Sequence, residues 1–452
     1  MTPVQDVAQR LAAQWGDDRV LRPGDDGFAT ATRLWNGAVR TRPAVVVRPR
    51  STAEVSAAVV AATQAGVGLS VRGGGHDWAG RALNDGGLVL DLGELRAVQV
   101  AGDVATAGGG SRSADVVAAA AAGGYVVATG TAGVVGMAGL SMGGGYGPLL
   151  GTAGLAADNL LGAEVVLADG TVVSTDDDPE LLWALRGGGG NFGVVTGLRV
   201  RLHEDRGLVG GMVLFPWSEA ASVLTRYAEL VADAPDGLTL LIEMTVVPDV
   251  GPCLLAVPVW SGPASGADAA LARVERLGTP LTSGVASATQ AQLLAGFDAA
   301  VPDGMHWQIR TRSVAALTPA VIDAVLASAA ARPGPGAGIG LRQFHGAATR
   351  VGADDTAFGT RTAHVALEIS AGHGPDDDPA PYRAWAEATD AAVAPHALPG
   401  GYPNFLGPDR HEQIGRAYGA HASRLVAVKE RYDPGHVFTA TPIPTREQLR
   451  SS

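Results

Sequence analysis

The sequence predicts an α+β protein of two or three domains, and three observations lead to this fold class. The chain has 452 residues, and one domain commonly takes about 100–200 residues. A β-α-β pattern covers residues 44–71, close to the start of the chain. Further β-rich runs lie between residues 238 and 370 and alternate with helical segments. Such runs favour one large sheet, covered by helices, in the middle of the chain.

Composition excludes several classes of protein. Charged residues make up 17% of the chain, the net charge is −12 and no basic cluster occurs, so a nucleic-acid partner is not expected. Glycine accounts for 63 residues without a three-residue period, which excludes collagen, and a hydrophobic content of 46% argues against a disordered chain. The one cysteine, Cys253, leaves no internal disulfide and no cysteine-rich metal site, and we expect it in the core.

The first region, residues 1–205, consists of short apolar runs separated by glycine. Ser51 and Glu54 have the spacing of a capping box, which predicts a helix that runs to Ala65 and ends before Gly66. The apolar and β-branched runs predict strands at residues 44–47, 67–71, 87–92, 163–168, 171–174 and 194–202, with a short helix at residues 179–185.

The second region, residues 206–399, mixes helices and strands, and the third, residues 400–452, is helical and charged. The third region predicts one long helix over residues 410–432, because the Asp-Pro-Gly sequence that follows cannot continue it. In the second region we expect helices at residues 216–232, 267–277 and 381–394, and strands at residues 238–246, 253–259, 338–344 and 364–370.

A charge-free segment, residues 116–157, is long enough to cross a membrane. Glycine is too frequent in it for a continuous helix. We interpret the segment as a buried, glycine-lined cradle in which backbone N–H groups approach a ligand. The N-terminal residues lack a basic stretch followed by an apolar one, so no secretory signal is expected. These observations predict a cytoplasmic protein without a membrane partner.

Two short motifs suggest chemistry that their surroundings do not support. Residues 188–193 satisfy G-x-G-x-x-G, but a helix precedes them and a strand follows, the reverse of a dinucleotide fingerprint. Residues 139–143 satisfy the G-x-S-x-G of a hydrolase around Ser141, but the glycines and proline that follow do not favour the required helix. A nicotinamide site and a serine hydrolase stay as minor alternatives. Without closely paired histidines, no metal site is expected.

A glycine turn with a histidine follows directly on a predicted strand, at residues 72–76. Three successive glycines can turn tightly around a pyrophosphate and offer it backbone donors. The glycines of residues 143–147 could form the opposite wall. His76 has three interpretations that the local sequence leaves open: a ligand contact, a base, or an ordinary turn residue.

Six segments resemble the berberine-bridge-enzyme-like flavin oxidases of the vanillyl-alcohol oxidase superfamily, in the order of that family. They are RPAVVVRPRSTAEV, VRGGGHDWAG, VGMAGLSMGGGYG, GLAADNLLGAEVVLADG, LLWALRGGGGNFGVVT and RLVAVKERYDPGHVF, which cover the chain from about residue 43 to 438. The resemblance implies a two-domain flavoprotein. Residues 1–205 would form an FAD-binding domain of two α/β subdomains, completed by residues 400–452. Residues 206–399 would form a substrate domain with a large antiparallel sheet covered by helices.

The resemblance also implies the cofactor, FAD, and its attachment. His76 falls on the histidine that attaches covalently to the flavin 8α-methyl group, and a neutral imidazole is nucleophilic enough to do so. Ala132 stands where many members have a cysteine for a second link, which implies a single link. Val135 falls on the position that controls oxygen access. The predicted cofactor-binding residues are Arg72, Gly73, Gly74, Gly75, His76, Asp77, Gly130, Gly136, Gly139, Gly143, Gly145, Asn159, Val195, Tyr402 and Asn404.

The catalytic base is where the sequence departs from the family pattern. Many members have a tyrosine at the position of Phe405, which cannot accept a proton. Glu368 is the leading candidate, because a desolvated carboxylate on an apolar strand has a raised pKa; the alternative is a solvated glutamate. His345 and Tyr146 are weaker candidates. The predicted catalytic residues are Glu368, Tyr146 and Val135.

The predicted function is an FAD-dependent oxidase. It would take a hydride from a small or aromatic, natural-product-like alcohol, amine or activated C–H group and reduce oxygen to hydrogen peroxide. Carbohydrate oxidation is an alternative, and so is a flavin-binding module with little turnover. The expected partners of this monomer or homodimer are a small-molecule substrate and molecular oxygen. Trp217, Trp260 and Trp307 could line an aromatic or sugar pocket, although core packing is commoner.

Overall fold

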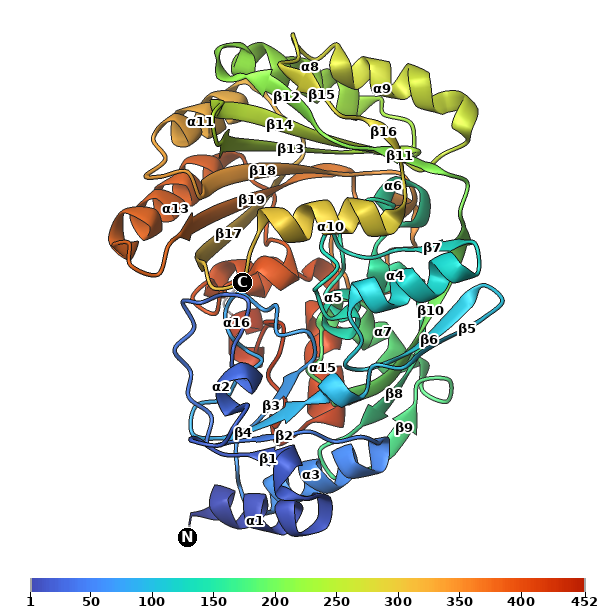
Figure 1. Ribbon diagram of the computed structural model, residues 1–452, viewed down its shortest axis with the longest axis vertical. Coiled ribbons are helices and arrows are strands. Elements are labelled where there is room, and N and C mark those ends of the chain that lie inside the picture. Colours follow the sequence, from blue (N-terminus) through green and yellow to red (C-terminus); the bar gives the residue numbers. More distant parts are fainter. Residues whose placement is uncertain (1, 451–452) are drawn as a thin grey trace.

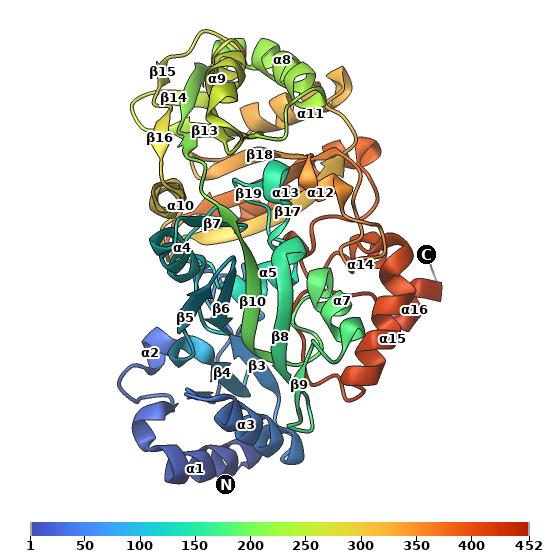
Figure 2. The same ribbon diagram turned by 90° about the vertical axis from the view of Figure 1, so that its right-hand side faces the viewer.

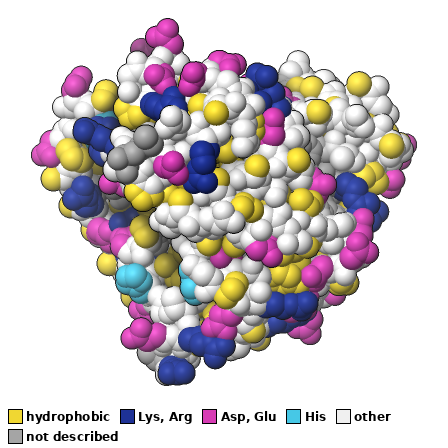
Figure 3. Space-filling view, turned by 90° about the horizontal axis from the view of Figure 1, so that it is seen from below, with side chains coloured by type: hydrophobic (Ala, Val, Ile, Leu, Met, Phe, Trp, Pro, Cys, Tyr) yellow, Lys and Arg dark blue, Asp and Glu magenta, His cyan; other side chains and the backbone are white. Residues whose placement is uncertain are grey.

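The computed structural model describes residues 2–450, which form two parts stacked along the long axis of the molecule (Figure 1). The lower part contains two sheets, and the upper part contains one nine-stranded sheet. The C-terminal helices return to the lower part (Figure 1). Seen from below, acidic and basic side chains are intermixed, and neither sign forms a continuous patch on this end (Figure 3).

The first sheet of the lower part has the order β1-β2-β4-β3. Its strands in that order are β1 (Val20–Leu21), β2 (Val45–Val47), β4 (Leu88–Asp91) and β3 (Leu69–Arg72). The last three are parallel, and α3 (Thr52–Gln64) follows β2 as the crossover that parallel strands require. α3 packs with α1 (Pro3–Trp15) on this sheet. Ser51 Oγ accepts the Glu54 N–H at 3.2 Å, which confirms the predicted N-cap.

The second sheet is antiparallel and has the order β5-β6-β10-β8-β9, with β7 paired to the end of β10. Its strands are β5 (Val98–Ala101), β6 (Val104–Gly108), β7 (Tyr125–Val127), β8 (Leu160–Val166), β9 (Val172–Ser174) and β10 (Val194–Glu204). The long strand β10 leads from this sheet up toward the upper part (Figure 2). Three helices share the apolar core of this sheet: α4 (Ser113–Ala122), α5 (Met137–Met142) and α7 (Pro179–Gly188). The short helix α6 (Leu150–Ala153) packs against the upper part instead.

The glycine-rich segment, residues 116–157, is more helical than the sequence suggested. It contains most of α4 and all of α5 and α6. The sequence prediction missed α4 although it is rich in alanine, the strongest helix former. Within residues 2–450, no helix is long and apolar enough to cross a membrane.

The upper sheet is antiparallel throughout, in the order β15-β12-β14-β13-β18-β19-β17, with β11 paired to β14 and β16 paired to β11. Its strands are β11 (Leu208–Gly210), β12 (Val213–Pro216), β13 (Leu238–Val247), β14 (Gly251–Trp260), β15 (Thr282–Ser283), β16 (Ala286–Ala288), β17 (His306–Val314), β18 (Ala337–Phe344) and β19 (His364–His373). The helices that pack on its outer face are α8 (Ala220–Ala232), α9 (Ala267–Glu275), α11 (Pro319–Ala330) and α13 (Pro379–Val393).

Alternation of side chains gives this sheet two faces. Ile242, Leu341 and Leu367 lie opposite one another on β13, β18 and β19 and belong to the apolar core beneath the helices. The residues next to them point to the other face, toward the lower part. Helix α10 (Gln290–Ala300) lies between the two parts on this side (Figure 1).

The C-terminal segment forms two helices, α14 (His411–Arg416) and α15 (Ala422–Tyr432), in place of the single helix predicted over residues 410–432. The break lies near Gly419, whose φ of +50° is outside the right-handed helical region. α15 packs with α7 in the core of the lower part, and α16 (Arg446–Arg450) follows it.

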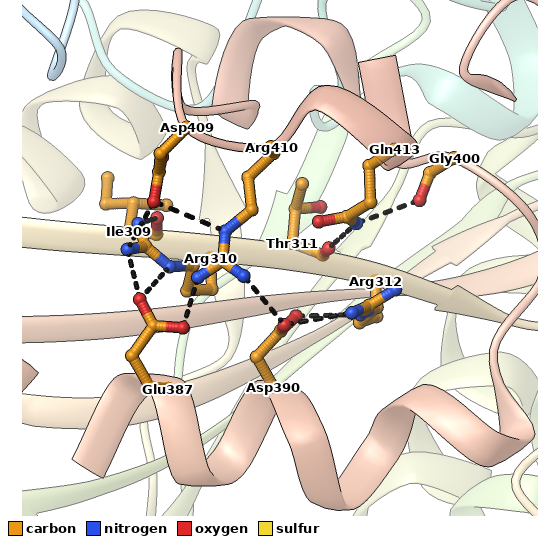
Figure 4. A network of polar contacts seen from close by, with 10 residues as sticks. All are labelled: Ile309, Arg310, Thr311, Arg312, Glu387, Asp390, Gly400, Asp409, Arg410 and Gln413. Atoms are coloured by element: carbon orange, nitrogen blue, oxygen red, sulfur yellow. Dashed lines mark hydrogen bonds and ion pairs between the residues drawn. The ribbon is translucent and has the colours of Figure 1, made fainter. Parts of the chain in front are cut away.

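An ion-pair network holds the start of the C-terminal segment against the upper sheet (Figure 4). Arg312 of β17 donates to Asp390 of α13 at 2.7 and 2.9 Å, and Arg410 donates to the same carboxylate at 3.3 Å. Gln413 donates to the Thr311 main-chain oxygen at 2.9 Å. The C-terminal segment is therefore fixed to both parts of the molecule.

Candidate active site

A cavity of about 570 Å³ lies between the two parts. Its floor is formed by two glycine-rich segments of the lower part, the loop around residues 73–77 and residues 130–142, which end in helix α5, and its roof by the inner face of β13, β18 and β19. The C-terminal segment adds Tyr402, Asn404 and Phe405. The volume lies within the range of small-molecule and cofactor sites, about 300–1,000 Å³. The cavity is therefore the candidate active site.

Two glycines of the floor meet backbone to backbone. A Cβ atom on Gly74 would lie 2.2 Å from the Gly136 nitrogen, and one on Gly136 would lie 2.5 Å from the Gly74 nitrogen. A side chain at either position would have to move a main chain. Gly75 has a φ of +68°, which glycine adopts at little cost. The glycine-lined cradle that the sequence predicts is this floor.

His76 ends the first glycine loop and lines the cavity. Its ring stacks on the Trp35 indole, with centroids 4.4 Å apart, and Trp35 stacks in turn on Trp307 at 5.3 Å. Burial lowers the pKa of His76, so the imidazole is neutral at pH 7. Its Nε2 is buried without a hydrogen-bond partner among the described residues. A neutral imidazole with a free nitrogen suits a nucleophile or a ligand contact better than an ordinary turn residue.

Most of the residues that the sequence predicts for the site line this cavity. For the cofactor they are Gly73, Gly74, Gly75, His76, Asp77, Gly130, Gly136, Gly139, Val195, Tyr402 and Asn404. For catalysis they are Val135, Tyr146 and Glu368. Ala132, at the position of the second cysteine, lines the cavity as well.

Four predicted cofactor-binding residues lie behind the cavity wall: Arg72, Gly143, Gly145 and Asn159. The Arg72 guanidinium pairs with Asp91 at 3.2 Å. The Asn159 amide donates to two main-chain oxygens at 2.8 Å. Gly143 packs against the Asn404 side chain, and the Gly145 N–H donates to the Tyr402 hydroxyl at 2.9 Å. These residues lie behind the lining of the cavity, and the Arg72 Nε is buried there without a hydrogen-bond partner among residues 2–450.

The two weaker candidates for the base do not fit that role. Burial raises the pKa of Tyr146 well above its usual value, and a phenol that resists ionisation is a poor proton acceptor near neutral pH. Its hydroxyl hydrogen bonds to the His364 ring at 3.1 Å, and its ring packs on Tyr402 at 4.6 Å. His345 lies outside the cavity wall, and burial lowers its pKa to about 4. Tyr146 is therefore a wall residue.

The roof carries one basic and two acidic side chains on neighbouring strands. Glu243 of β13 and Glu368 of β19 both lie opposite Gly340 of β18, the strand between them. Arg342 donates to Glu368 Oε2 from Nε at 3.0 Å and from Nη2 at 2.6 Å, and Ser370 donates to Oε1 at 3.1 Å. Glu368 is therefore a carboxylate at the cavity that is paired with Arg342, a partner that the sequence did not indicate.

Glu243 is a roof residue that sequence reasoning missed. It lines the cavity, and its carboxyl lies over Gly340, where a Cβ atom would be 2.7 Å from Glu243 Oε1. Burial and the charge of Glu368 raise the pKa of Glu243 to about 8, against the opposing effect of Arg342. The run TLLIEMTVV, residues 239–247, shows a single carboxyl in an apolar strand, which is the signal that pointed to Glu368.

Aromatic side chains form much of the remaining wall. Trp307, Phe405 and Phe297 line the cavity, whereas Trp217 and Trp260 pack in the core of the upper part. Cys253 is buried, as predicted. Within residues 2–450, no group of three or more His, Cys, Asp or Glu side chains could hold a metal ion.

The residues present fit FAD. The glycine floor allows a diphosphate to approach the main chain closely. His76 presents a ring nitrogen without a partner. Aromatic rings such as Trp307 and Tyr146 offer packing surfaces for planar groups.

Comparison with known proteins assigns the family. Residues 43–176 match the model of the FAD binding domain, and residues 401–442 match that of berberine and berberine-like proteins. The FAD-linked oxidoreductase aurO of Gibberella zeae is 32% identical over 433 residues, which cover 93% of this chain and 84% of that protein. The chain belongs to the berberine-bridge-enzyme-like family of FAD-linked oxidoreductases.

Other berberine-bridge-enzyme-like proteins share sequence and fold with this chain. (R)-6-Hydroxynicotine oxidase of Paenarthrobacter nicotinovorans is 37% identical over 286 residues, which cover 61% of this chain and 62% of that protein. The crystal structure of 6-hydroxy-D-nicotine oxidase from Arthrobacter nicotinovorans matches at a TM-score of 0.83 and 31% identity, covering 93% of this chain and 96% of that one. The predicted α+β fold of a two-domain flavoenzyme, the FAD cofactor and the class of FAD-dependent oxidoreductase are confirmed.

Proposed function

We propose that this protein is an FAD-dependent oxidase of a small or aromatic alcohol, amine or activated C–H substrate, and that it reduces oxygen to hydrogen peroxide. The observation that carries the proposal is one cavity that has His76 in a glycine floor and a carboxyl cluster in its roof. FAD, when bound, supplies the oxidising chemistry. The protein's own residues orient the substrate and accept the proton that its oxidation releases.

A single covalent attachment of FAD, through His76, is part of this proposal. The neutral imidazole with a free Nε2 supports it. The chain has one cysteine, Cys253, which lies buried in the upper part, and Ala132 offers no thiol at the cavity. Glucooligosaccharide oxidase from Acremonium strictum, at 24% identity, has a 6-S-cysteinyl, 8α-N1-histidyl FAD. The proposal therefore distinguishes this chain from a relative with two links.

We assign FAD binding and substrate binding to different parts of the molecule. Residues 1–205 and 400–452 would bind FAD, and residues 206–399 would bind the substrate. Strand β10 ends at Glu204 and β11, in the upper sheet, begins at Leu208, which supports the first boundary. The packing of α15 on α7 supports the return of the C-terminal segment to the FAD-binding side.

The cavity wall favours an aromatic substrate over an oligosaccharide. Trp307, Phe405 and Phe297 offer ring faces, and Val257 and Leu255 add aliphatic surface. Nicotine oxidases are among the similar proteins. Oligosaccharide oxidases share the fold at 21–24% identity, so carbohydrate oxidation is the alternative that the experiment must test.

The experiment is an anaerobic reduction of the purified holoenzyme with a panel of aromatic amines, alcohols and oligosaccharides. We expect at least one small aromatic compound to bleach the flavin absorbance, and air to restore it with release of hydrogen peroxide. Bleaching by oligosaccharides alone would overturn the substrate class. A reduced flavin that persists in air would overturn the oxidase assignment, and no bleaching by any compound would favour a binding module.

A further inference from the structure

We propose that Glu243 accepts the substrate's proton and that the roof binds a protonated amine. This inference rests on the proposed oxidase function and narrows its substrate class. Both hydrogen bonds that Arg342 makes in the roof go to Glu368. One guanidinium balances one carboxylate, so the roof carries a surplus negative charge whenever Glu243 is ionised.

The sheet leaves the Glu243 carboxyl available to a ligand. Its neighbour on β18 is Gly340, and its neighbour on β14 is Leu255, which has no polar atom in its side chain. A side chain at position 340 would displace the carboxyl, because a Cβ atom there would be 2.7 Å from Oε1 and 3.0 Å from Oε2. Among residues 2–450, none makes a hydrogen bond or an ion pair with Glu243. Its oxygens are thus left to whatever occupies the cavity.

The charged groups around Glu243 determine when it holds a proton. Glu368 raises its pKa and Arg342 lowers it. Tyr146 and Tyr402 also lie near Arg342, and burial raises the pKa of both, so they stay neutral. Burial adds to the effect of Glu368, so the site without substrate keeps the proton on Glu243 at pH 7. A cation beside the carboxyl favours its ionised form and so expels that proton.

The proton transfer is balanced without any other reactant. A Glu243 oxygen takes a proton from the bound ammonium group; the N–H bond breaks, an O–H bond forms, and the electron pair stays on nitrogen. Nothing is oxidised or reduced in this step. The neutral amine that remains is the form whose neighbouring C–H bond can be oxidised, and FAD is the oxidant that the family's activity supplies. An alcohol or an anion brings no positive charge that would favour the ionised form of Glu243, so neither gains the attraction that an ammonium group gains.

The test uses two ligands that lack an oxidisable C–H bond next to the heteroatom. Cumylamine is the cation and cumyl alcohol its neutral counterpart. Calorimetric titration of the FAD-loaded protein at pH 7, in two buffers of different ionisation enthalpy, gives both the affinity and the number of protons released. We expect cumylamine to bind about tenfold or more tightly than the alcohol, and close to one proton to be released.

The variants separate the two carboxyls. Glu243→Gln should lose both the preference for cumylamine and the proton release. Glu368→Gln should keep the proton release, with its midpoint shifted to lower pH, because the charge that raises the pKa of Glu243 is gone.

Equal binding of the two ligands to the parent protein, or no binding of either, would overturn the inference. Proton release that persists in Glu243→Gln would do the same. If that variant folds poorly, the pH dependence of the proton count of the parent decides. Release from Glu243 should disappear above its pKa of about 8, whereas release from the ligand's own ammonium group would persist at that pH. The titration involves no turnover, so its failure differs from failure of the proposed function, which would be seen as a flavin that no substrate bleaches.

Discussion

The floor and the roof of the cavity depend on different features of the chain. The floor depends on residue type: Gly74 and Gly136 touch through their main chains, and any side chain there would clash. The roof depends on register: Glu243 and Glu368 meet over Gly340 only because β13, β18 and β19 align there. The floor therefore tolerates little change in shape, whereas the roof tolerates isosteric changes and responds to changes in charge.

The largest expected effect is on the floor, at His76. His76→Ala removes the nitrogen proposed to bind the flavin, so covalent flavin should be lost completely, while FAD still binds without the link because the glycine loops remain. The measurement is flavin fluorescence of the denatured protein, compared with flavin released into the acid supernatant. Covalent flavin that survives in the variant would place the link elsewhere.

Two alanine substitutions in the same glycine loop test whether the close approach of main chains holds the floor together. In Gly74→Ala the added atom would lie 2.2 Å from the Gly136 nitrogen, and we expect a loss of about 2–4 kcal/mol in stability together with poor flavin loading. In Gly73→Ala the nearest atom is the Gly109 oxygen at 3.5 Å, an ordinary contact, so the loss should stay below about 1 kcal/mol. Urea unfolding and the flavin-to-protein absorbance ratio measure both. Equal losses in the two variants would contradict the close approach as the cause.

Because the pKa of Glu243 is raised in the folded protein, the free energy of unfolding should depend on pH. Glu243 ionises near its usual pKa of about 4.5 in the unfolded chain and near 8 in the folded protein. Between these values the folded state holds the extra proton, so the free energy of unfolding of the parent should fall as pH rises. Glu243→Gln removes this dependence and should be the more stable protein by about 1–3 kcal/mol at pH 7.5, with no such gain near pH 4. Unfolding curves of both proteins at several pH values test this, and parallel pH dependences would refute it.

The smallest expected effect concerns bulk at the cavity wall. Val135→Leu adds a methylene group to the floor and should slow reoxidation of the reduced flavin severalfold, about 1 kcal/mol in barrier, while reduction by substrate is nearly unchanged. Val135→Ala, which removes bulk, is the control and should not slow reoxidation. Stopped-flow mixing of the reduced proteins with oxygen gives both rates. Unchanged reoxidation in Val135→Leu would remove this residue from the account.

The same contrast explains how much could be predicted from the sequence. The N-cap at Ser51, the glycine turn and His76 depend on neighbouring residues and were found in advance. FAD and the family could also be predicted, because the segments that resemble the family are short stretches of neighbouring residues. Register between distant strands cannot be read from a single sequence, so the pairing of Arg342 with Glu368 was not expected.

Other misses have the same physical origin. Trp35 stacks on His76 from a segment without a motif, and only the folded chain brings them together. The run from residue 410 to 432 has helical composition, but Gly419 adopts a φ of +50° and breaks it, and the presence of a glycine does not by itself predict that conformation. Arg72 and Asn159 also make contacts that a single sequence does not show, with Asp91 and with two main-chain oxygens, and their contact with FAD stays a prediction.

The central claim is that the floor binds FAD and that Glu243 in the roof accepts the substrate's proton. Its most direct test is the pH dependence of the rate at which substrate reduces the flavin without air. The reductant is the amine of the panel that bleaches the parent protein fastest. We predict that the rate in the parent rises with pH as Glu243 ionises, that Glu243→Gln is slow and lacks this rise, and that Glu368→Gln keeps the rise at lower pH. A rise that persists in Glu243→Gln and disappears in Glu368→Gln would contradict this account and assign the proton to Glu368.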